Sequence, residues 1–127
     1  MNRAYSPFVP ARSPGGRPEQ EPQYRILVHR KFEQQWDQLV QRVGIAGARQ
    51  FWNHVSRTPS APSAIASITL LKGAAGKPMN EGWSRTHHYE VSGAGRINYQ
   101  YNNHYMTTQH SDEHAIVAIM TINYSSH

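Results

Sequence analysis

Residues 82–101 read GWSRTHHYEVSGAGRINYQY, and this stretch decides the fold. From Trp83 onward, apolar and polar side chains alternate with a period of two, which is typical of β-strands. The segments 83–92 and 96–101 flank the turn Gly93-Ala94-Gly95, whose glycines can adopt positive φ. The stretch therefore predicts a β-hairpin.

Further strands are predicted on both sides of this hairpin. Residues 115–124 are almost uninterruptedly apolar, which predicts a strand inside the sheet, and residues 102–114 form a polar loop before it. Upstream, residues 68–71 are apolar and read as a strand or as an apolar approach to a loop. Residues 72–78 then predict a flexible, basic loop.

Two helices are predicted before the hairpin, after a strand at residues 24–28. The first helix has its apolar side chains at positions that share one helical face: Phe32, Trp36, Leu39, Val40 and Val43. Gly44 ends it, because glycine favours the backbone of a helix C-terminus. A second helix, residues 46–56, repeats the spacing with Ile45, Ala48, Phe51 or Trp52, and Val55, and Pro59 forbids its continuation.

The first 23 residues differ in composition from the rest of the chain. They are rich in proline, contain adjacent glycines and have few apolar side chains that could pack. Such a segment cannot bury enough apolar surface to offset its ordering entropy, so we expect residues 1–23 to be a disordered tail. It is a passive extension or a docking segment, and residues 24–127 form the folded domain.

The predicted order is strand, helix, helix and three antiparallel strands, an α+β fold in which a small antiparallel sheet packs against a two-helix hairpin. The chain of 127 residues is long enough for one domain and has no cysteine, which excludes disulfides and thiolate chemistry. No apolar run reaches the roughly 18 residues of a spanning helix, and no signal peptide is recognisable. We expect a cytoplasmic protein.

Charge is distributed unevenly along the chain, whose formal net charge is +5. Residues 24–59 contain six basic side chains and two acidic ones, whereas residues 60–127 contain four of each. The basic surplus falls on the predicted helices, and a polyanion such as RNA is a suitable partner for it. A solvated basic face without a partner accounts for the same charges.

Several short motifs follow one another in a definite order. They are Leu71-Lys72-Gly73, Gly76-Lys77-Pro78, Gly82-Trp83-Ser84-Arg85, Arg96-Ile97-Asn98-Tyr99 and a last strand that leads to aromatic and histidine residues. In this order they resemble the RelE/ParE superfamily of toxins from type II toxin–antitoxin systems, nearest its YoeB-like branch. The resemblance spans about residues 24–127, and the proline-rich segment has no counterpart in it.

The resemblance implies a RelE-like β-α-α-β-β-β fold and a metal-independent, ribosome-dependent endoribonuclease that cuts mRNA and inhibits translation. It implies as partners the ribosome with its mRNA and a cognate antitoxin protein, with no cofactor and no membrane. In this reaction a ribose 2′-hydroxyl attacks the neighbouring phosphate, which requires a base, cations that stabilise the growing negative charge, and an acid for the leaving 5′-oxygen.

Arginines are the first candidates for the phosphate. Arg96 stands directly after the hairpin turn, where such toxins place a phosphate-binding arginine, and a planar guanidinium can bind phosphate through two hydrogen bonds. Arg85 is a second candidate for the same phosphate, unless it pairs with Glu81 or Glu90. Lys72 and Lys77 are further candidates for binding RNA phosphates from the basic loop.

The base and the acid have several candidates. Glu81 is the candidate base, although the family pattern expects the glutamate directly after the proline, where Met79 stands here. His87 shares a strand face with Arg85 by alternation and could act as base instead, since histidine titrates near neutral pH. At the C-terminus, His127 is a candidate acid and Tyr124 a stacking or proton-donating partner.

Other signals in the sequence are weaker. His104, His110 and His114 with Asp112 and Glu113 have no standard metal-ligand spacing, which favours a polar loop over a metal site. Two alternatives to a nuclease stay open. A ParE-like toxin uses the same scaffold to bind and inhibit DNA gyrase without cutting RNA, and a RelE-like fold can serve as a binding module without catalysis.

Overall fold

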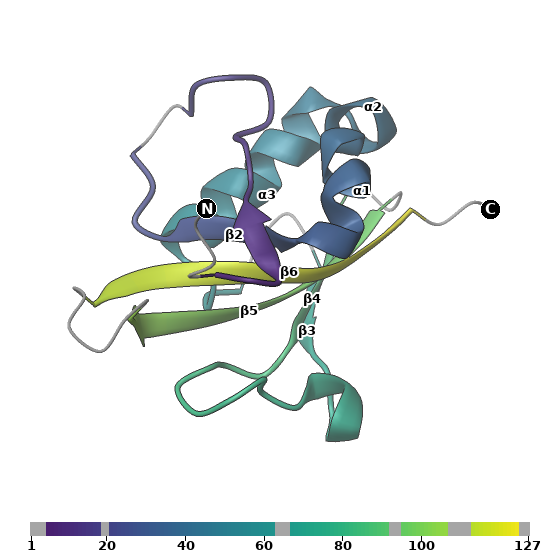
Figure 1. Cartoon of the computed structure of the whole chain (residues 1–127). Coiled ribbons are helices and arrows are strands. Elements are labelled where there is room, and N and C mark those ends of the chain that lie inside the picture. The colour runs from purple at the N-terminus through teal and green to yellow at the C-terminus, as the bar shows by residue number, and fades with distance from the viewer. Residues whose placement is uncertain (1–4, 19–20, 63–66, 92–94, 107–112, 125–127) are drawn as a thin grey trace.

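The computed structural model describes residues 5–18, 21–62, 67–91, 95–106 and 113–124. Within these residues a six-stranded sheet has its helical layer on one face and a long loop on the other (Figure 1). The strand order is β1-β2-β6-β5-β4-β3. The predicted α+β class is confirmed, but the sheet has more strands than the four that the sequence predicts.

The elements have the following bounds. The strands are β1 (Phe8–Pro10), β2 (Arg25–His29), β3 (Ser67–Leu70), β4 (His87–Val91), β5 (Gly95–Tyr105) and β6 (His114–Tyr124). The helices are α1 (Glu33–Asp37), α2 (Leu39–Val43) and α3 (Ile45–Arg57), with short 3₁₀ helices η1 (Arg30–Phe32) and η2 (Gly73–Gly76). None of the described helices is long and apolar enough to cross a membrane.

Strand β6 lies inside the sheet, as its apolar sequence predicts. It pairs parallel to β2 and antiparallel to β5, so the sheet is mixed, which corrects the expectation of an antiparallel sheet. Residues 116–119 are all buried, which requires cover on both faces of the sheet. From Thr121 onward exposed and buried residues alternate, because one face of the sheet is open there.

The helical layer is held by an aromatic core. Phe51 of α3 contacts Trp36 of α1 and the rings of Tyr89 and Tyr99 in the sheet, at centroid distances of 4.9 to 6.2 Å. Phe51 and Trp52 are both buried, so the helical face of α3 is wide enough to include both candidates. The second predicted helix is therefore confirmed, with one residue more at each end.

The first predicted helix is interrupted at Gln38, which separates α1 from α2. In a continuous helix the Gln35 carbonyl oxygen would accept a hydrogen bond from the amide of Leu39. Here the Tyr124 hydroxyl donates to this oxygen at 2.5 Å, and the Gln38 amide donates to it at 3.2 Å. A residue of the sheet thus satisfies the carbonyl that would otherwise accept the next hydrogen bond of the helix.

The N-terminal segment is part of the fold, which corrects the expectation of a disordered tail for residues 5–18 and 21–23. Strand β1 pairs antiparallel with β2, and the amide of Ala11 donates to the Ile26 carbonyl at 3.0 Å. The chain then crosses the helical layer, where the indole of Trp36 donates to the Arg12 carbonyl at 3.0 Å. Hydrogen bonds to its extended backbone hold this segment, and Val9 and Ala11 pack against the hydrophobic core.

Strand β4 begins at His87, four residues later than the sequence predicts. Before His87 the backbone of β5 is bound by Ser84, through the Tyr101 carbonyl and amide, whereas Arg85 and Thr86 bind the preceding loop. The Thr86 amide donates to the Gly76 carbonyl and the Leu71 amide donates to the Thr86 carbonyl, both at 3.0 Å. Strand β5 in turn runs to Tyr105, into the segment expected to be a polar loop. The turn residues Gly93 and Ala94 lie outside the described residues.

Candidate functional site

The sheet presents a polar surface on the face opposite the helices. Side chains at alternate positions of β5 lie on this face, and they are Arg96, Asn98, Gln100 and Asn102. The other β5 face, with Ile97 and Tyr99, is buried in the core. The loop between β3 and β4 lies below the sheet in Figure 1, on the same side as this polar surface.

The loop covers only one end of the polar surface. Gln100 anchors it: its side-chain amide donates to the Lys77 carbonyl at 2.9 Å and accepts from the Met79 amide at 3.0 Å. Gln100 also donates to the Thr86 hydroxyl at 3.0 Å and is fully buried. The end of the surface that carries Arg96 remains open, and there it is hollowed.

This open hollow has a volume of about 420 Å³. Its lining residues come from η1, β4, β5 and β6, and they are Phe32, His88, Arg96, Asn98, Thr121, Ile122 and Asn123. Arg96 lies opposite Asn123, and Asn98 lies opposite both Thr121 and His88 in the strand register. The hollow thus combines one fixed positive charge with neutral hydrogen-bonding groups.

The guanidinium of Arg96 is only loosely paired in this hollow. Among the described residues its ion-pair partner is Glu90, with 3.9 Å between Nε and Oε1, which is too long for a hydrogen bond. The Arg96 side chain is 37% exposed. A guanidinium that is partly exposed and loosely paired can bind an anionic ligand with its free N–H groups.

His88 and Asn98 form a hydrogen-bonded pair across β4 and β5. The distance between His88 Nδ1 and Asn98 Oδ1 is 2.6 Å. An amide oxygen only accepts, so Nδ1 carries the proton and donates it. In the neutral ring Nε2 then has a free lone pair, and the ring lines the hollow.

Arg85, the second predicted phosphate ligand, is committed to the loop. Its Nε and Nη2 donate to the Leu71 carbonyl at 3.2 and 2.9 Å, and Nη2 also donates to the Gly73 carbonyl at 3.1 Å. The guanidinium lies so close to Gly76 that a Cβ added there would be 2.7 Å from Nη2. Neither Glu81 nor Glu90, the carboxylates considered from the sequence, forms an ion pair with it among the described residues.

His87 lies on the helix-facing side of β4, away from the hollow. Its ring stacks on Tyr99 at a centroid distance of 5.1 Å, and Nδ1 is 3.0 Å from the Arg85 carbonyl oxygen. It is only 7% exposed, and this burial lowers the pKa of His87 below its ordinary value. The predicted common face of His87 and Arg85 is not seen, because Arg85 precedes the strand.

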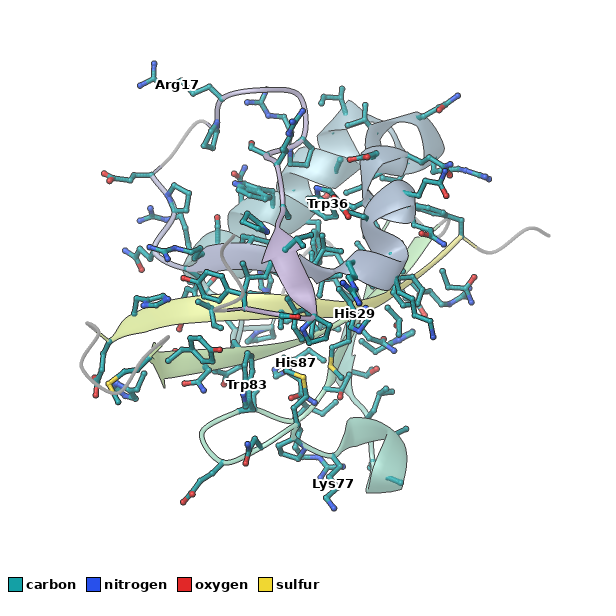
Figure 2. All side chains as sticks on the ribbon, in the orientation of Figure 1. Arg17, His29, Trp36, Lys77, Trp83 and His87 are labelled. Atoms are coloured by element: carbon teal, nitrogen blue, oxygen red, sulfur yellow. The ribbon has the colours of Figure 1, made fainter. Side chains whose placement is uncertain are left out.

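The site residues predicted in the loop, Lys72, Lys77 and Glu81, do not line the open hollow. The Lys77 backbone is bound to Gln100, about 13 Å along β5 from Arg96 at the usual strand rise. Figure 2 shows the Lys77 side chain pointing away from the sheet. Glu81 and Lys72 are exposed, and the Glu81 amide binds the Asn80 side chain at 2.8 Å.

Tyr124 lies on the helix-facing side of the sheet. Besides the hydrogen bond to Gln35 it lies under the guanidinium of Arg42, which is 5.3 Å from its ring centroid. Burial raises the pKa of Tyr124 to about 12, with Arg42 opposing the shift. Its hydroxyl and the Arg96 guanidinium are on opposite faces of the sheet, and His127 lies outside the described residues.

Two other places were candidates for ligands. Among the described residues no group of three or more His, Asp or Glu side chains is placed to hold a metal ion. His104 pairs with Glu113 at 3.2 Å, whereas His110 and Asp112 lie outside the described part of the chain. A hollow of about 390 Å³ beside Trp52 is lined by the N-terminal segment together with β2 and the start of β6, and its Arg25 donates to the Tyr5 hydroxyl.

The structure therefore brings Arg96 together with residues that the sequence did not single out as a site: His88, Asn98, Thr121 and Asn123. Alternation in β5 and β6 places these side chains on one face, but the strand register that aligns them depends on an irregularity between Asn98 and Tyr99. Comparisons of the chain with protein-family models, curated proteins and solved structures give no match.

Proposed function

We propose that this protein is a toxin of the RelE/ParE type that cuts mRNA on the ribosome, with Arg96 as the side chain that binds the scissile phosphate. The observation that carries the proposal is the open hollow, where a partly exposed, loosely paired guanidinium is surrounded by neutral polar groups. A phosphodiester fits such a lining because its charge pairs with Arg96 and its oxygens accept hydrogen bonds.

The order of the helices and strands supports the proposed RelE-like scaffold. Without the edge strands β1 and β3, the chain runs through β2, the helices, β4, β5 and β6. This is the order that the sequence motifs imply for the superfamily. β1 and β3 add one strand to each edge of that arrangement without changing the connections inside it.

In the proposed reaction the ribose 2′-oxygen forms a bond to phosphorus while the bond from phosphorus to the 5′-oxygen breaks. The products are a 2′,3′-cyclic phosphate and a free 5′-hydroxyl. Arg96 stabilises the additional negative charge on the phosphoryl oxygens as the 2′-oxygen attacks. The basic helices lie on the opposite face of the sheet and are available to ribosomal RNA or to an acidic antitoxin.

The decisive experiment is primer extension on an mRNA that is being translated, with wild-type protein and Arg96→Ala. We expect in-frame cuts with the wild type and a loss of at least about 100-fold with the variant, the range found when one group that stabilises a transition-state oxyanion is removed. Arg17→Ala is the matched control. It removes the same charge from the N-terminal segment, and Figure 2 shows Arg17 far from the sheet.

A second candidate function is inhibition of DNA gyrase by binding. It is favoured by the placement of Arg85 and Tyr124, because one is bound to loop carbonyls and the other lies on the helix-facing side. A nuclease site built as the resemblance implies would use both. Inhibition of supercoiling by purified gyrase, without cuts in any translated transcript, would establish this function in place of the nuclease.

A further inference from the structure

We infer that His88 is the general base of this site and that Asn98 positions it. The inference rests on the proposed function, and it assigns the base to neither of the sequence candidates, Glu81 and His87. It follows from the hydrogen bond between His88 Nδ1 and Asn98 Oδ1 and from the place of both residues in the open hollow.

This hydrogen bond determines which ring nitrogen of His88 can accept a proton. Asn98 Oδ1 is 2.6 Å from Nδ1 and can only accept, so it keeps the proton on Nδ1. The lone pair of the neutral imidazole is then on Nε2, the nitrogen that does not contact Asn98. A histidine whose tautomer and ring orientation are set by a neighbouring acceptor is the usual arrangement of a catalytic base.

The strand register places this base beside the phosphate ligand. His88 pairs with Asn98, and the next pair on the same face is Glu90 with Arg96. His88 and Arg96 are therefore diagonal neighbours, whose Cβ atoms lie about 7 Å apart in an antiparallel sheet. This separation lets a guanidinium bind a phosphate while the imidazole reaches the 2′-hydroxyl of the adjoining ribose.

The other candidates for the base are placed less well. His87 is on the helix-facing side, stacked on Tyr99 and only 7% exposed. Glu81 lies in the exposed loop beyond Gln100, which occupies the covered end of the polar surface. Neither lines the hollow that holds Arg96.

The step balances without a cofactor. His88 Nε2 takes the proton of the 2′-hydroxyl while the 2′-oxygen bonds to phosphorus, and the 5′-oxygen leaves and takes a proton from solvent. His88 is then a catalytic residue, because it touches the reacting hydroxyl. Asn98 is a positioning residue, because it acts only through the His88 ring.

Two charged groups lie near His88. Arg96 lies in the same hollow and Glu90 lies next to Arg96 on the same face. The remaining lining residues of η1, β5 and β6 have no titratable side chain, and they are Phe32, Asn98, Thr121, Ile122 and Asn123. A general base must be unprotonated to accept the proton of the 2′-hydroxyl, so the rate is expected to fall at acid pH.

The test is steady-state cleavage of mRNA on programmed ribosomes between pH 5.5 and 8.5. We expect His88→Gln to lower kcat by at least about 100-fold with little change in KM, and to abolish the fall in rate at acid pH. Asn98→Ala is expected to lower kcat about tenfold, whereas Asn98→Asp, which still accepts from Nδ1, restores it. His104→Gln, an exposed histidine of β5, is the control.

A second measurement follows the ring itself. In wild-type protein the ¹⁵N resonances of His88 are expected to report a proton on Nδ1, and addition of 3′-AMP is expected to shift them. Asn98→Ala removes the preference for this tautomer, and Arg96→Ala removes the response to 3′-AMP. Circular dichroism of each variant shows whether it is folded.

The outcomes separate the two proposals. If the wild type cuts mRNA and folded His88→Gln cuts it at a similar rate with the same pH profile, His88 is not the base and the proposed function stands. If the wild type cuts no transcript, the proposed function fails and the assignment of a base fails with it. A His88 ring protonated on Nε2 in the wild type would also overturn the inference.

Discussion

The guanidinium of Arg85 donates from both Nε and Nη2 to the carbonyl oxygen of Leu71, at 3.2 and 2.9 Å. The two residues lie at opposite ends of the loop between β3 and β4, so this contact closes the loop. A third hydrogen bond, to the Gly73 carbonyl, ties η2 to the same side chain. Arg85 therefore organises the loop that covers the Gln100 end of the polar surface.

We expect Arg85→Ala to loosen this loop while the sheet stays folded. The variant leaves the Leu71 carbonyl without its charged donor and lowers the free energy of unfolding by about 1–2 kcal/mol, a modest figure because the side chain is exposed. Hydrogen exchange should accelerate at the Thr86 and Lys77 amides but not in β6. Unchanged exchange in residues 71–86 would show that Arg85 does not close the loop.

Stability is expected to fall as the pH is lowered from 7 to 5. Burial lowers the pKa of His87 and His54 in the folded protein, whereas in the unfolded chain both titrate near about 6.5. As the pH falls through this value, the unfolded chain takes up protons that the folded protein does not, so the free energy of unfolding decreases. Urea denaturation at several pH values measures the slope.

His87→Phe keeps an aromatic ring on Tyr99 but cannot titrate, so the slope should become shallower. The matched variant His104→Gln removes an exposed histidine and should preserve the decrease at acid pH. Equal slopes for the wild type and His87→Phe would mean that His87 takes up its proton as readily in the folded protein as in the unfolded chain.

Removal of residues 1–18 is expected to destabilise the domain. It deletes β1, exposes the edge of β2 and removes the Arg12 carbonyl that accepts from the Trp36 indole. Trp36→Phe isolates the last of these contacts and should cost about 1 kcal/mol, the usual value of one hydrogen bond. Thermal unfolding compares the three proteins.

The truncated protein should lose more stability than Trp36→Phe, because it loses strand pairing as well. A truncated chain with the melting temperature of the full chain would show that residues 1–18 contribute no net stability, in agreement with the sequence expectation of a tail. A truncation that is less stable but still cuts mRNA would separate this structural role from the proposed chemistry.

Tyr124→Phe distinguishes packing from chemistry at the end of β6. The variant loses the hydrogen bond to the Gln35 carbonyl and is expected to lower the free energy of unfolding by about 1 kcal/mol. Cleavage at a temperature where the protein is folded should persist, because the hydroxyl faces α1. Loss of cleavage at unchanged stability would instead assign Tyr124 the proton-donating role that the sequence motifs imply.

Local patterns accounted for much of the fold. The apolar spacing of Phe51 and Val55 predicts α3, and the alternation around Tyr89 and Ile97 predicts the paired strands β4 and β5. These elements follow from short stretches whose preferences agree with their final environment. The sequence did not predict the break between α1 and α2 at Gln38, because this break depends on Tyr124, which is distant in sequence.

The candidate site, too, was predicted from the sequence only in part. From the sequence, Arg96 is the first candidate for the phosphate and Arg85 the second. In the structure Arg85 is bound to carbonyls of the preceding loop, while Arg96 opens into a hollow with His88 and Asn98. The sequence patterns did not single out His88, since the hydrogen bond that orients it spans two strands.

By itself the sequence determined the α+β class, the second helix, the buried strand β6 and the position of one arginine after the hairpin turn. Those features depend on periodicity and turn preference, which are properties of neighbouring residues. The tertiary structure alone decided that the N-terminal segment joins the sheet, that Arg85 serves the loop, and that Tyr124 faces the helices. Each of these depends on a hydrogen bond or strand pairing between segments far apart in the chain, and no local pattern encodes such a pairing.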